Sequence, residues 1–246
     1  MKGLTQKKRN PSKEIDLIAF VAHELKNPLA SCLMNAYMLK DGLLGELNER
    51  QQKAVASLVR NLEYFDDTIH HYLNLTRIEQ GNLKIEPRSI LVVHDVVQPC
   101  LENLDRQITT KKIKVVNELP PGDIHLVADP ALLRIVFNNL LNNAIVYGRE
   151  GGTVRLSAFE HGGWWEFSVW NEGVGIPRDK IKTLFRKFNR VENPSAPKLR
   201  GTGLGLYITR TIIERHGGTI SADSEEGSWA QFRFTLPAVV SPPSGA

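Results

Sequence analysis

The spacing of the apolar residues changes near Gly81, and this change constrains the fold more than any other feature of the chain. From Ile15 to about Leu44 the apolar residues recur every three or four positions, and the same spacing returns from about Gln51 to Ile78. This periodicity predicts two helices. The stretch between them, "DGLLGELNE", predicts a turn because it holds two glycines and an asparagine that could cap the second helix. A helical hairpin that ends at Gly81 is therefore expected.

Beyond Gly81 short alternating or β-branched runs take over, interleaved with helical segments near 94–110, 130–147, 178–187 and 204–216. The strand-like runs are "LKIEP", "IKVVNEL", "TVRLSAFE", "WWEFSVWN", "TISADS" and "WAQFRFTL". Two glycine-containing turns, in "AFEHGGWWEF" and "ADSEEGSWAQF", predict β-hairpins and hence antiparallel neighbours. We expect a mixed sheet with helices over one face, and a helix that starts at Asp129 as N-cap with Pro130 in its first turn.

These patterns divide the chain into four parts. Residues 1–14 are expected to form a basic linker or N-terminal extension, 15–82 the helical hairpin and 83–237 the α/β domain. Residues 238–246, rich in proline and serine, are expected to be a disordered tail. Two helices of this length cannot bury their apolar stripes on each other alone, so the hairpin predicts a homodimer that closes a four-helix bundle.

Composition excludes several classes of protein. A chain of 246 residues with 41% apolar content is ordinary for a globular protein. The net charge of +4 comes with basic residues gathered in the opening "MKGLTQKKRNPSK", so no nucleic-acid partner is expected. The two cysteines, Cys32 and Cys100, predict neither a disulfide framework nor a metal cluster and fit a reducing cytoplasm. No apolar run approaches the ~18 residues of a membrane span, so membrane contact is expected only through a sensor region outside this sequence.

The stretch "AHELKNPLAS" contains a histidine, His23, on the side of the first helix opposite its apolar residues. A lone helical histidine is usually a surface residue without a role. Pro28 changes this interpretation, because a proline inside a helix removes a backbone hydrogen bond and bends the helix, at a cost of ~3 kcal/mol. Glu24 is adjacent and Asn27 lies one turn further on the same face. An imidazole beside a carboxylate suits a nucleophile with its proton acceptor.

Three segments of the second half suit a nucleotide. "NNLLNNAIVYG" (138–148) puts Asn139 and Asn143 on one helical face, and "WNEGVGIP" (170–177) follows an apolar strand with glycines that permit close backbone approach to a ligand. "RGTGLGLYI" (200–208) leads a glycine-rich turn into a helix, whose N-terminus binds anions through free N–H groups and the helix dipole. Each segment alone is weak evidence, but their order and spacing together indicate a nucleotide site.

These residues carry a resemblance to a family. "HELKNPL" (23–29) resembles the H box of sensor histidine kinases, and the three later segments resemble the N, G1 and G2 boxes of their ATP-binding domain, which gyrase, heat-shock 90 chaperones and mismatch-repair ATPases share. "LFRKFNR" (184–190) resembles the F box, with Phe185 and Phe188 as hinges and 189–200 as a mobile lid. The resemblance covers about residues 14–237. It implies a dimeric all-α hairpin followed by an α/β sandwich ATP-binding domain with a mixed sheet, ATP and Mg²⁺ as cofactors, and a response-regulator receiver domain as partner.

The resemblance also implies residue roles. His23 would accept the γ-phosphoryl group with Glu24 as base, and Asn27 would orient the water that dephosphorylates the regulator. Asn143 would coordinate Mg²⁺, with Asn139 in support. The other nucleotide-binding positions implied are Tyr147, Asn171, Gly173, Gly175, Ile176, Phe188, Arg190, Gly201, Thr202, Gly203, Leu204 and Gly205.

Two positions depart from the family pattern. Asn171 stands where the family usually has aspartate, and because a carboxamide can turn to offer either a donor or an acceptor, GTP is expected to be rejected less strongly than by an aspartate. Val146 stands where the family usually has a lysine that contacts phosphate. The residues that could supply this charge instead are Arg149, Arg190, Lys198 and Arg200.

Two other functions remain open at this point. One is an ATP-driven conformational machine of the chaperone or mismatch-repair type, which would need no phosphoryl acceptor and which His23, Glu24 and Pro28 disfavour. The other is a non-catalytic scaffold that keeps the fold, dimerises and binds regulators. Val146 and Asn171 keep that second alternative open, and a nucleotide-binding titration separates it from a kinase.

Overall fold

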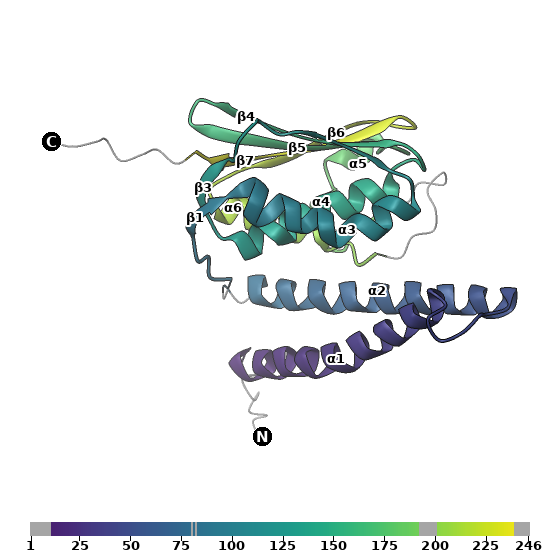
Figure 1. Ribbon diagram of the computed structural model, residues 1–246. Helices are drawn as coiled ribbons and strands as arrows, with labels where there is room; N and C mark the ends of the chain where they lie inside the picture. The colour runs from purple at the N-terminus through teal and green to yellow at the C-terminus, as the bar shows by residue number, and fades with distance from the viewer. Residues whose placement is uncertain (1–10, 80, 82, 192–200, 239–246) are drawn as a thin grey trace, which may run out of the picture. The chain divides into compact units, whose positions relative to one another are not determined.

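A computed structural model describes residues 11–79, 81, 83–191 and 201–238, with side chains from Glu24 onward except at Lys26. The chain divides into two compact units, residues 1–82 and residues 83–246, which Figure 1 shows as a helical hairpin and an α/β domain. The predicted tail beyond Ala238 lies outside the described residues. None of the helices in the described part of the chain is long and apolar enough to cross a membrane.

The first unit is the predicted hairpin, α1 (Pro11–Lys40) followed by α2 (Glu49–Glu79). Asn48 caps α2 as predicted, because its Oδ1 accepts a hydrogen bond of 2.9 Å from the Gln51 N–H while the Gln51 side chain accepts one of 2.9 Å from the Asn48 N–H. At the other end Gly81, with φ of +69°, donates its N–H to the Ile78 carbonyl at 3.0 Å. Reciprocal capping and a left-handed glycine thus define where α2 begins and ends.

The two helices pack on small and branched side chains, with Ala36 of α1 and Val59 of α2 each 1% exposed. The Tyr37 hydroxyl of α1 donates a 2.6 Å hydrogen bond to the Glu63 carboxylate of α2. A second apolar stripe on α2 stays exposed: its residues Leu58, Phe65 and Tyr72, which we call the α2 stripe, are 47%, 45% and 49% exposed. Their seven-residue spacing is that of a coiled-coil seam.

The second unit contains a five-stranded mixed sheet in the order β2-β4-β5-β7-β6, in which β2 and β4 are parallel and all other neighbours antiparallel. A separate antiparallel pair joins β1 to β3. Both predicted hairpins, β4–β5 and β6–β7, are present. The strands are β1 (Arg88–Leu91), β2 (Lys114–Glu118), β3 (His125–Ala128), β4 (Thr153–His161), β5 (Trp164–Glu172), β6 (Ile220–Glu225) and β7 (Trp229–Pro237).

Helices cover one face of this sheet, as Figure 1 shows for α3, α4 and α6. The helices of this unit are the π-helical turn η1 (Val93–Val97), α3 (Gln98–Thr110), α4 (Pro130–Tyr147), α5 (Arg178–Ile181) and α6 (Gly205–Arg215). The core between the layers is aromatic: the Phe137 ring of α4 stands edge-on to Phe167 of β5 and Phe234 of β7, at centroid distances of 5.8 Å and 5.4 Å. This packing fixes α4 against the middle of the sheet.

Two predicted elements are wrong. The run "LKIEP" (83–87) forms no strand, and β1 begins only at Arg88, because Pro87 has no N–H to pair with a neighbouring strand. The helix expected over 178–187 stops at Ile181. There the Thr183 hydroxyl donates to the Lys180 carbonyl at 3.0 Å, and the Asn189 amide donates to the Thr183 carbonyl at 2.8 Å. These side-chain bonds occupy carbonyls that a longer helix would need.

Asp129 caps α4 as the sequence predicts. Its Oδ1 accepts hydrogen bonds from the N–H groups of Ala131 and Leu132 at 2.9 Å and 3.1 Å, and its Oδ2 accepts one from Glu86 at 3.0 Å. Its own N–H donates to His216 Nε2, just beyond α6, at 3.2 Å. The end of β3, the start of α4 and the end of α6 therefore meet at this residue.

Candidate nucleotide-binding site

Helix α4 presents Asn139, Asn143 and Tyr147 at four-residue intervals, so all three lie on one face. The Asn139 amide donates to the Gly205 carbonyl at 3.2 Å and to the Thr209 hydroxyl at 3.3 Å. This residue therefore joins α4 to the first turn of α6. Sequence reasoning gave Asn139 a supporting role but could not identify its partner Thr209, which is completely buried.

Asn143 has a different environment from Asn139. Its side chain is half-buried and makes no hydrogen bond to another of the described residues. An amide oxygen in this situation is available to a hard cation such as Mg²⁺, which prefers oxygen ligands and keeps several waters. Among the described residues, no group of three or more His, Cys, Asp or Glu side chains could hold a metal ion. The magnesium contact predicted for Asn143 therefore rests on its half-buried amide oxygen, a ligand type that Mg²⁺ accepts, and stays a prediction.

The end of α4 is joined to the loop after β5. Gly148 and Gly173 form an isolated antiparallel bridge, and the Val174 N–H donates to the Tyr147 carbonyl at 3.4 Å. A Cβ on Gly148 would lie 2.4 Å from the Ala144 carbonyl oxygen, and one on Gly173 would lie 2.3 Å from the Tyr147 carbonyl oxygen. Only glycine fits at either position, so the N-box and G1-box segments meet by direct backbone contact.

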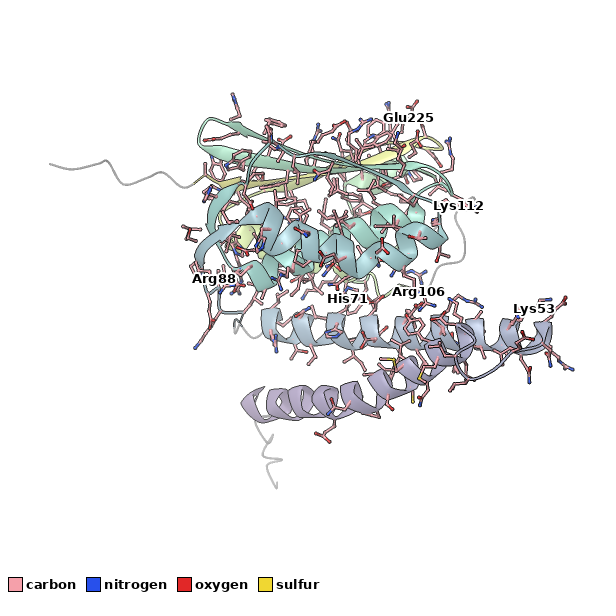
Figure 2. All side chains as sticks on the ribbon, viewed as in Figure 1. Lys53, His71, Arg88, Arg106, Lys112 and Glu225 are labelled. Carbon is pink, nitrogen blue, oxygen red and sulfur yellow. The ribbon has the colours of Figure 1, made fainter. Side chains whose placement is uncertain are left out.

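The same loop is held on its other side by the turn between β6 and β7. Gly175 has a φ of +62°, and a Cβ there would lie 2.2 Å from the carbonyl oxygen of Glu225, a residue labelled in Figure 2. The Ile176 N–H donates to the Ser224 hydroxyl at 2.8 Å. Gly173, Gly175 and Ile176 therefore belong to one loop that is anchored on both sides.

The glycine-rich turn before α6 rests on the F-box segment. Gly203 has a φ of +68°, and a Cβ there would lie 2.7 Å from the carbonyl carbon of Phe188 and 2.9 Å from the Asn189 oxygen. Leu204 is completely buried, whereas Gly201 is exposed. The Thr202 hydroxyl accepts a 3.3 Å hydrogen bond from the Leu204 N–H. Helix α6 begins at Gly205, and its first N–H groups are free of intrahelical partners, as an anion site requires.

Phe188 is 57% exposed and has a φ of +58°, a conformation that costs a residue with a Cβ about 1 kcal/mol or more. The other predicted hinge, Phe185, packs edge-on against Phe232 of β7 at a centroid distance of 6.5 Å. Arg190 is exposed at the end of this segment. The predicted lid lies for the most part in 192–200, outside the described residues.

Close to Val146, where the family usually has a lysine, lies a cation that sequence reasoning did not identify. Lys111 Nζ donates to the carbonyl oxygens of Ile145 and Val146 at 2.6 Å and 2.7 Å. Burial lowers the pKa of the Lys111 ammonium below its usual value. A cation here satisfies two unpaired carbonyls and complements the negative end of the α4 dipole. Lys111 directly follows the helix predicted near 94–110, but its position in the sequence does not indicate which carbonyl oxygens its side chain contacts.

Of the four cations considered as replacements for the lysine charge, Arg149 and Arg190 are exposed. Lys198 and Arg200 lie outside the described residues. In the first unit His23 lies within α1, together with Pro28, and its side chain is outside the described part of the chain. The side chains of Glu24 and Asn27 on the same helix are exposed.

Comparison with known proteins agrees with both units. Residues 13–81 match the sequence model of the "His Kinase A (phospho-acceptor) domain", and residues 128–240 match that of the "Histidine kinase-, DNA gyrase B-, and HSP90-like ATPase". The chain is 32% identical over 229 residues to the adaptive-response sensory kinase SasA of Synechococcus elongatus, covering 90% of this chain and 58% of that protein. It is 29% identical over 238 residues to the sensor histidine kinase WalK of Bacillus subtilis, covering 95% and 38%.

Solved structures show the same relationship. Full-length ShkA in complex with AMPPNP superposes with a TM-score of 0.67 at 24% identity, over 93% of this chain and 47% of that one, which supports the fold. The catalytic domain of the histidine kinase ThkA gives a TM-score of 0.53 at 28% identity, over 62% of this chain and 96% of that one. The chain spans 58% of the length of SasA and 38% of the length of WalK. With a phospho-acceptor hairpin followed by an ATP-binding α/β domain, the chain belongs to the histidine kinase family and forms a sensor histidine kinase transmitter core.

Proposed function

We propose that this chain transfers the γ-phosphoryl group of ATP to His23 and then to an aspartate of a response-regulator receiver domain. The observation that carries the proposal is a set of three contacts: the backbone contacts joining Tyr147 to Val174 and Gly203 to Phe188, and the hydrogen bond from the Asn139 side chain to the Gly205 carbonyl. These contacts gather four segments of the ATP-binding domain around one site. The same chain holds a phospho-acceptor hairpin, which argues against a conformational machine that lacks an acceptor.

The chemistry follows from the residue types. A ring nitrogen of His23 attacks the γ-phosphorus in line, a P–N bond forms, and the bond from phosphorus to the bridging oxygen breaks so that ADP leaves. The imidazole N–H proton goes to the Glu24 carboxylate. The N-terminus of α6 holds the phosphates, and a Mg²⁺ ion held by Asn143 would neutralise the charge that develops on them. Tyr147 and Asn171 border the base.

Phosphatase activity towards the regulator belongs to the same proposal. Asn27 is exposed one turn along α1 from His23, where it can orient a water molecule but has no part in the attack on ATP. We therefore expect Asn27→Ala to slow loss of phosphate from the receiver domain much more than it slows labelling of His23. Equal loss of both rates would indicate that Asn27 only supports the helix.

A homodimer is the proposed assembly. The α2 stripe, Leu58, Phe65 and Tyr72, is exposed in the single chain although the opposite side of the helix packs on α1. A second copy would bury both stripes in a four-helix bundle. A cytoplasmic location is part of the proposal because the substrate, ATP, is an intracellular nucleotide.

Incubation with γ-labelled ATP and Mg²⁺ tests the reaction directly. The label should be acid-labile and base-stable, as a phosphohistidine is, and His23→Gln should abolish it. His71→Gln, a substitution of an α2 histidine that does not lie next to a proline, serves as the matched control and should keep the label. Incorporation of such a label into His23→Gln would refute the assignment.

A non-catalytic scaffold is the second candidate. The observation in its favour is that Lys111, a cation next to Val146, is already bonded to two carbonyl oxygens and so does not replace the phosphate contact that the family lysine makes. The absence of any ATP·Mg²⁺ binding in a calorimetric titration would support this candidate. Binding without label on His23 would leave a nucleotide-regulated scaffold, and binding with label would exclude a scaffold.

A further inference from the structure

The chain enters the ATP-binding domain through residues 83–86, which we call the entry segment. They belong to the second unit but to no helix or strand, because α2 ends at Glu79 and β1 begins only at Arg88, a residue labelled in Figure 2. A segment of this kind depends on side chains or water for its backbone hydrogen bonds. The side chains that hold the entry segment therefore decide where the chain is first attached to the domain.

The first of these side chains is Arg215, in the last turn of α6. Its Nη1 donates a 2.8 Å hydrogen bond to the carbonyl oxygen of Leu83, which lies 132 positions earlier in the chain. The Leu83 side chain is 5% exposed, so packing holds this residue as well. A hydrogen bond from a charged donor is roughly twice as strong as one between neutral groups. Leu83, the first residue of the second unit, is thus attached to the end of α6.

The second of these side chains is Asp129. Its Oδ2 accepts a 3.0 Å hydrogen bond from the Glu86 N–H, and its own N–H donates to His216 Nε2 at 3.2 Å. Because His216 directly follows Arg215, both side chains tie the entry segment to the place where α4 begins and α6 ends. Lys84, between the two attached residues, is exposed.

Helix α6 does not need the Arg215 bond for its own end. The His216 N–H donates to the Ile212 carbonyl at 3.1 Å and closes the last turn through the backbone. Arg210 shows the local alternative, because its Nε donates to the Glu214 carboxylate of the same helix at 2.7 Å. Arg215 instead serves the entry segment.

We propose that Arg215 is a positioning residue for phosphoryl transfer to His23, because it fixes the point at which the tether from the hairpin is attached to the ATP-binding domain. The proposal rests on the proposed function in one respect, namely that His23 accepts the γ-phosphoryl group. With the bond, the backbone is attached from Leu83. Without it, the next backbone attachment is the one at Glu86. One residue spans at most about 3.3–3.6 Å, so losing the bond lengthens the tether by up to about 10 Å.

A longer tether lowers the effective concentration of one unit at the other, roughly as the −3/2 power of its length. Counted from the end of α2, the tether about doubles in length, which corresponds to a fall of roughly threefold. A loosely attached domain also loses orientation towards the imidazole, and the transfer rate depends on orientation. ATP affinity does not depend on the tether, because every residue proposed to hold the nucleotide lies in the second unit. Rate and affinity should therefore separate.

Labelling of His23 by γ-labelled ATP·Mg²⁺, on the full chain, measures the rate. At saturating ATP, Arg215→Met should label about three- to tenfold more slowly than wild type, while its ATP affinity in calorimetry stays within about twofold. Arg215→Lys should recover at least about half of the wild-type rate, because an ammonium can donate to the same carbonyl. Arg210→Met is the matched control and should label at the wild-type rate.

Limited trypsin digestion reports the attachment itself. Cleavage after Lys84 requires the entry segment to detach from the domain, so it should be about three- to tenfold faster in Arg215→Met and unchanged in Arg210→Met. Mass spectrometry identifies the cut. If thermal melting shows that Arg215→Met does not fold, Arg215→Gln, which keeps a polar side chain at this exposed position, replaces it in both experiments.

Three results would overturn the proposal: a wild-type labelling rate in Arg215→Met, a rate that falls only together with ATP affinity, or cleavage after Lys84 as slow as in wild type. Each of these leaves labelling of wild-type His23, and so the proposed function, intact. Absence of label on wild-type His23 despite ATP binding would refute the proposed function and the positioning role with it.

Discussion

At the scale of single residues, the two asparagines of α4 show what sequence can and cannot predict. Their spacing predicted a shared face, because helical geometry alone determines it. It could not predict that Asn139 bonds to Gly205 and Thr209 whereas Asn143 is left unpaired among the described residues. That difference depends on the position of α6, more than sixty residues later in the chain, and so on tertiary packing.

The unpaired amide of Asn143 leads to a prediction. Asn143→Ala should weaken ATP·Mg²⁺ binding by at least about tenfold, because it removes the proposed oxygen ligand of the metal, while thermal melting of the domain stays close to wild type. Isothermal titration calorimetry measures the affinity. Asn142→Ala, one position earlier on a different face of α4, is the control and should bind normally. Equal affinity of wild type and Asn143→Ala would show that Mg²⁺ is held elsewhere.

At the scale of secondary structure, helix ends were predicted best where a local cap defines them. Asp129 and Asn48 cap α4 and α2 through hydrogen bonds to residues two or three positions away. Because the cap and its partners are close in the chain, the local sequence alone predicts these helix starts. The strand expected at "LKIEP" is absent because Pro87 has no N–H for strand pairing, which the apolar alternation of the run does not reveal. The parallel pairing of β2 with β4 could not be predicted from the sequence either, since hairpin patterns predict only antiparallel neighbours.

The C-terminus of α4 depends on a clamp that joins it to the end of α3. Lys111→Met should lower the free energy of unfolding of the ATP-binding domain by about 1–2 kcal/mol, because two charged hydrogen bonds to helix carbonyls are lost. Urea denaturation measures the change. Lys112→Met, at the exposed neighbouring lysine labelled in Figure 2, is the control. A loss equal to that of the control would mean that water replaces the Lys111 ammonium without penalty.

At the scale of the whole molecule, the division into a hairpin and an α/β domain was predictable because the apolar period itself changes near Gly81. It leads to a prediction about assembly. Phe65→Glu, in the middle of the α2 stripe, should weaken dimerisation at least about 100-fold, since it buries an unpaired charge. Sedimentation velocity measures the mass. Leu43→Glu, at an exposed residue of the turn between α1 and α2, should remain dimeric, and a dimeric Phe65→Glu would refute the α2 stripe as the interface.

ATP binding should be retained in Phe65→Glu, because every residue proposed to hold the nucleotide lies in the second unit. This variant therefore tests dimerisation without affecting nucleotide binding.

The bond between Asp129 and His216 has a mechanical consequence. Helix α4 runs from Asp129 towards the site and α6 runs from the site back to His216, so the two helices are pinned together at the far end by this bond and near the site by Asn139. Helices joined at two points along their length can neither slide past each other nor separate at one end. These two bonds thereby fix the distance between the Asn143 amide and the first N–H groups of α6. The proposed phosphate contacts would therefore depend in part on His216, which lies at the opposite end of both helices from the proposed phosphate site.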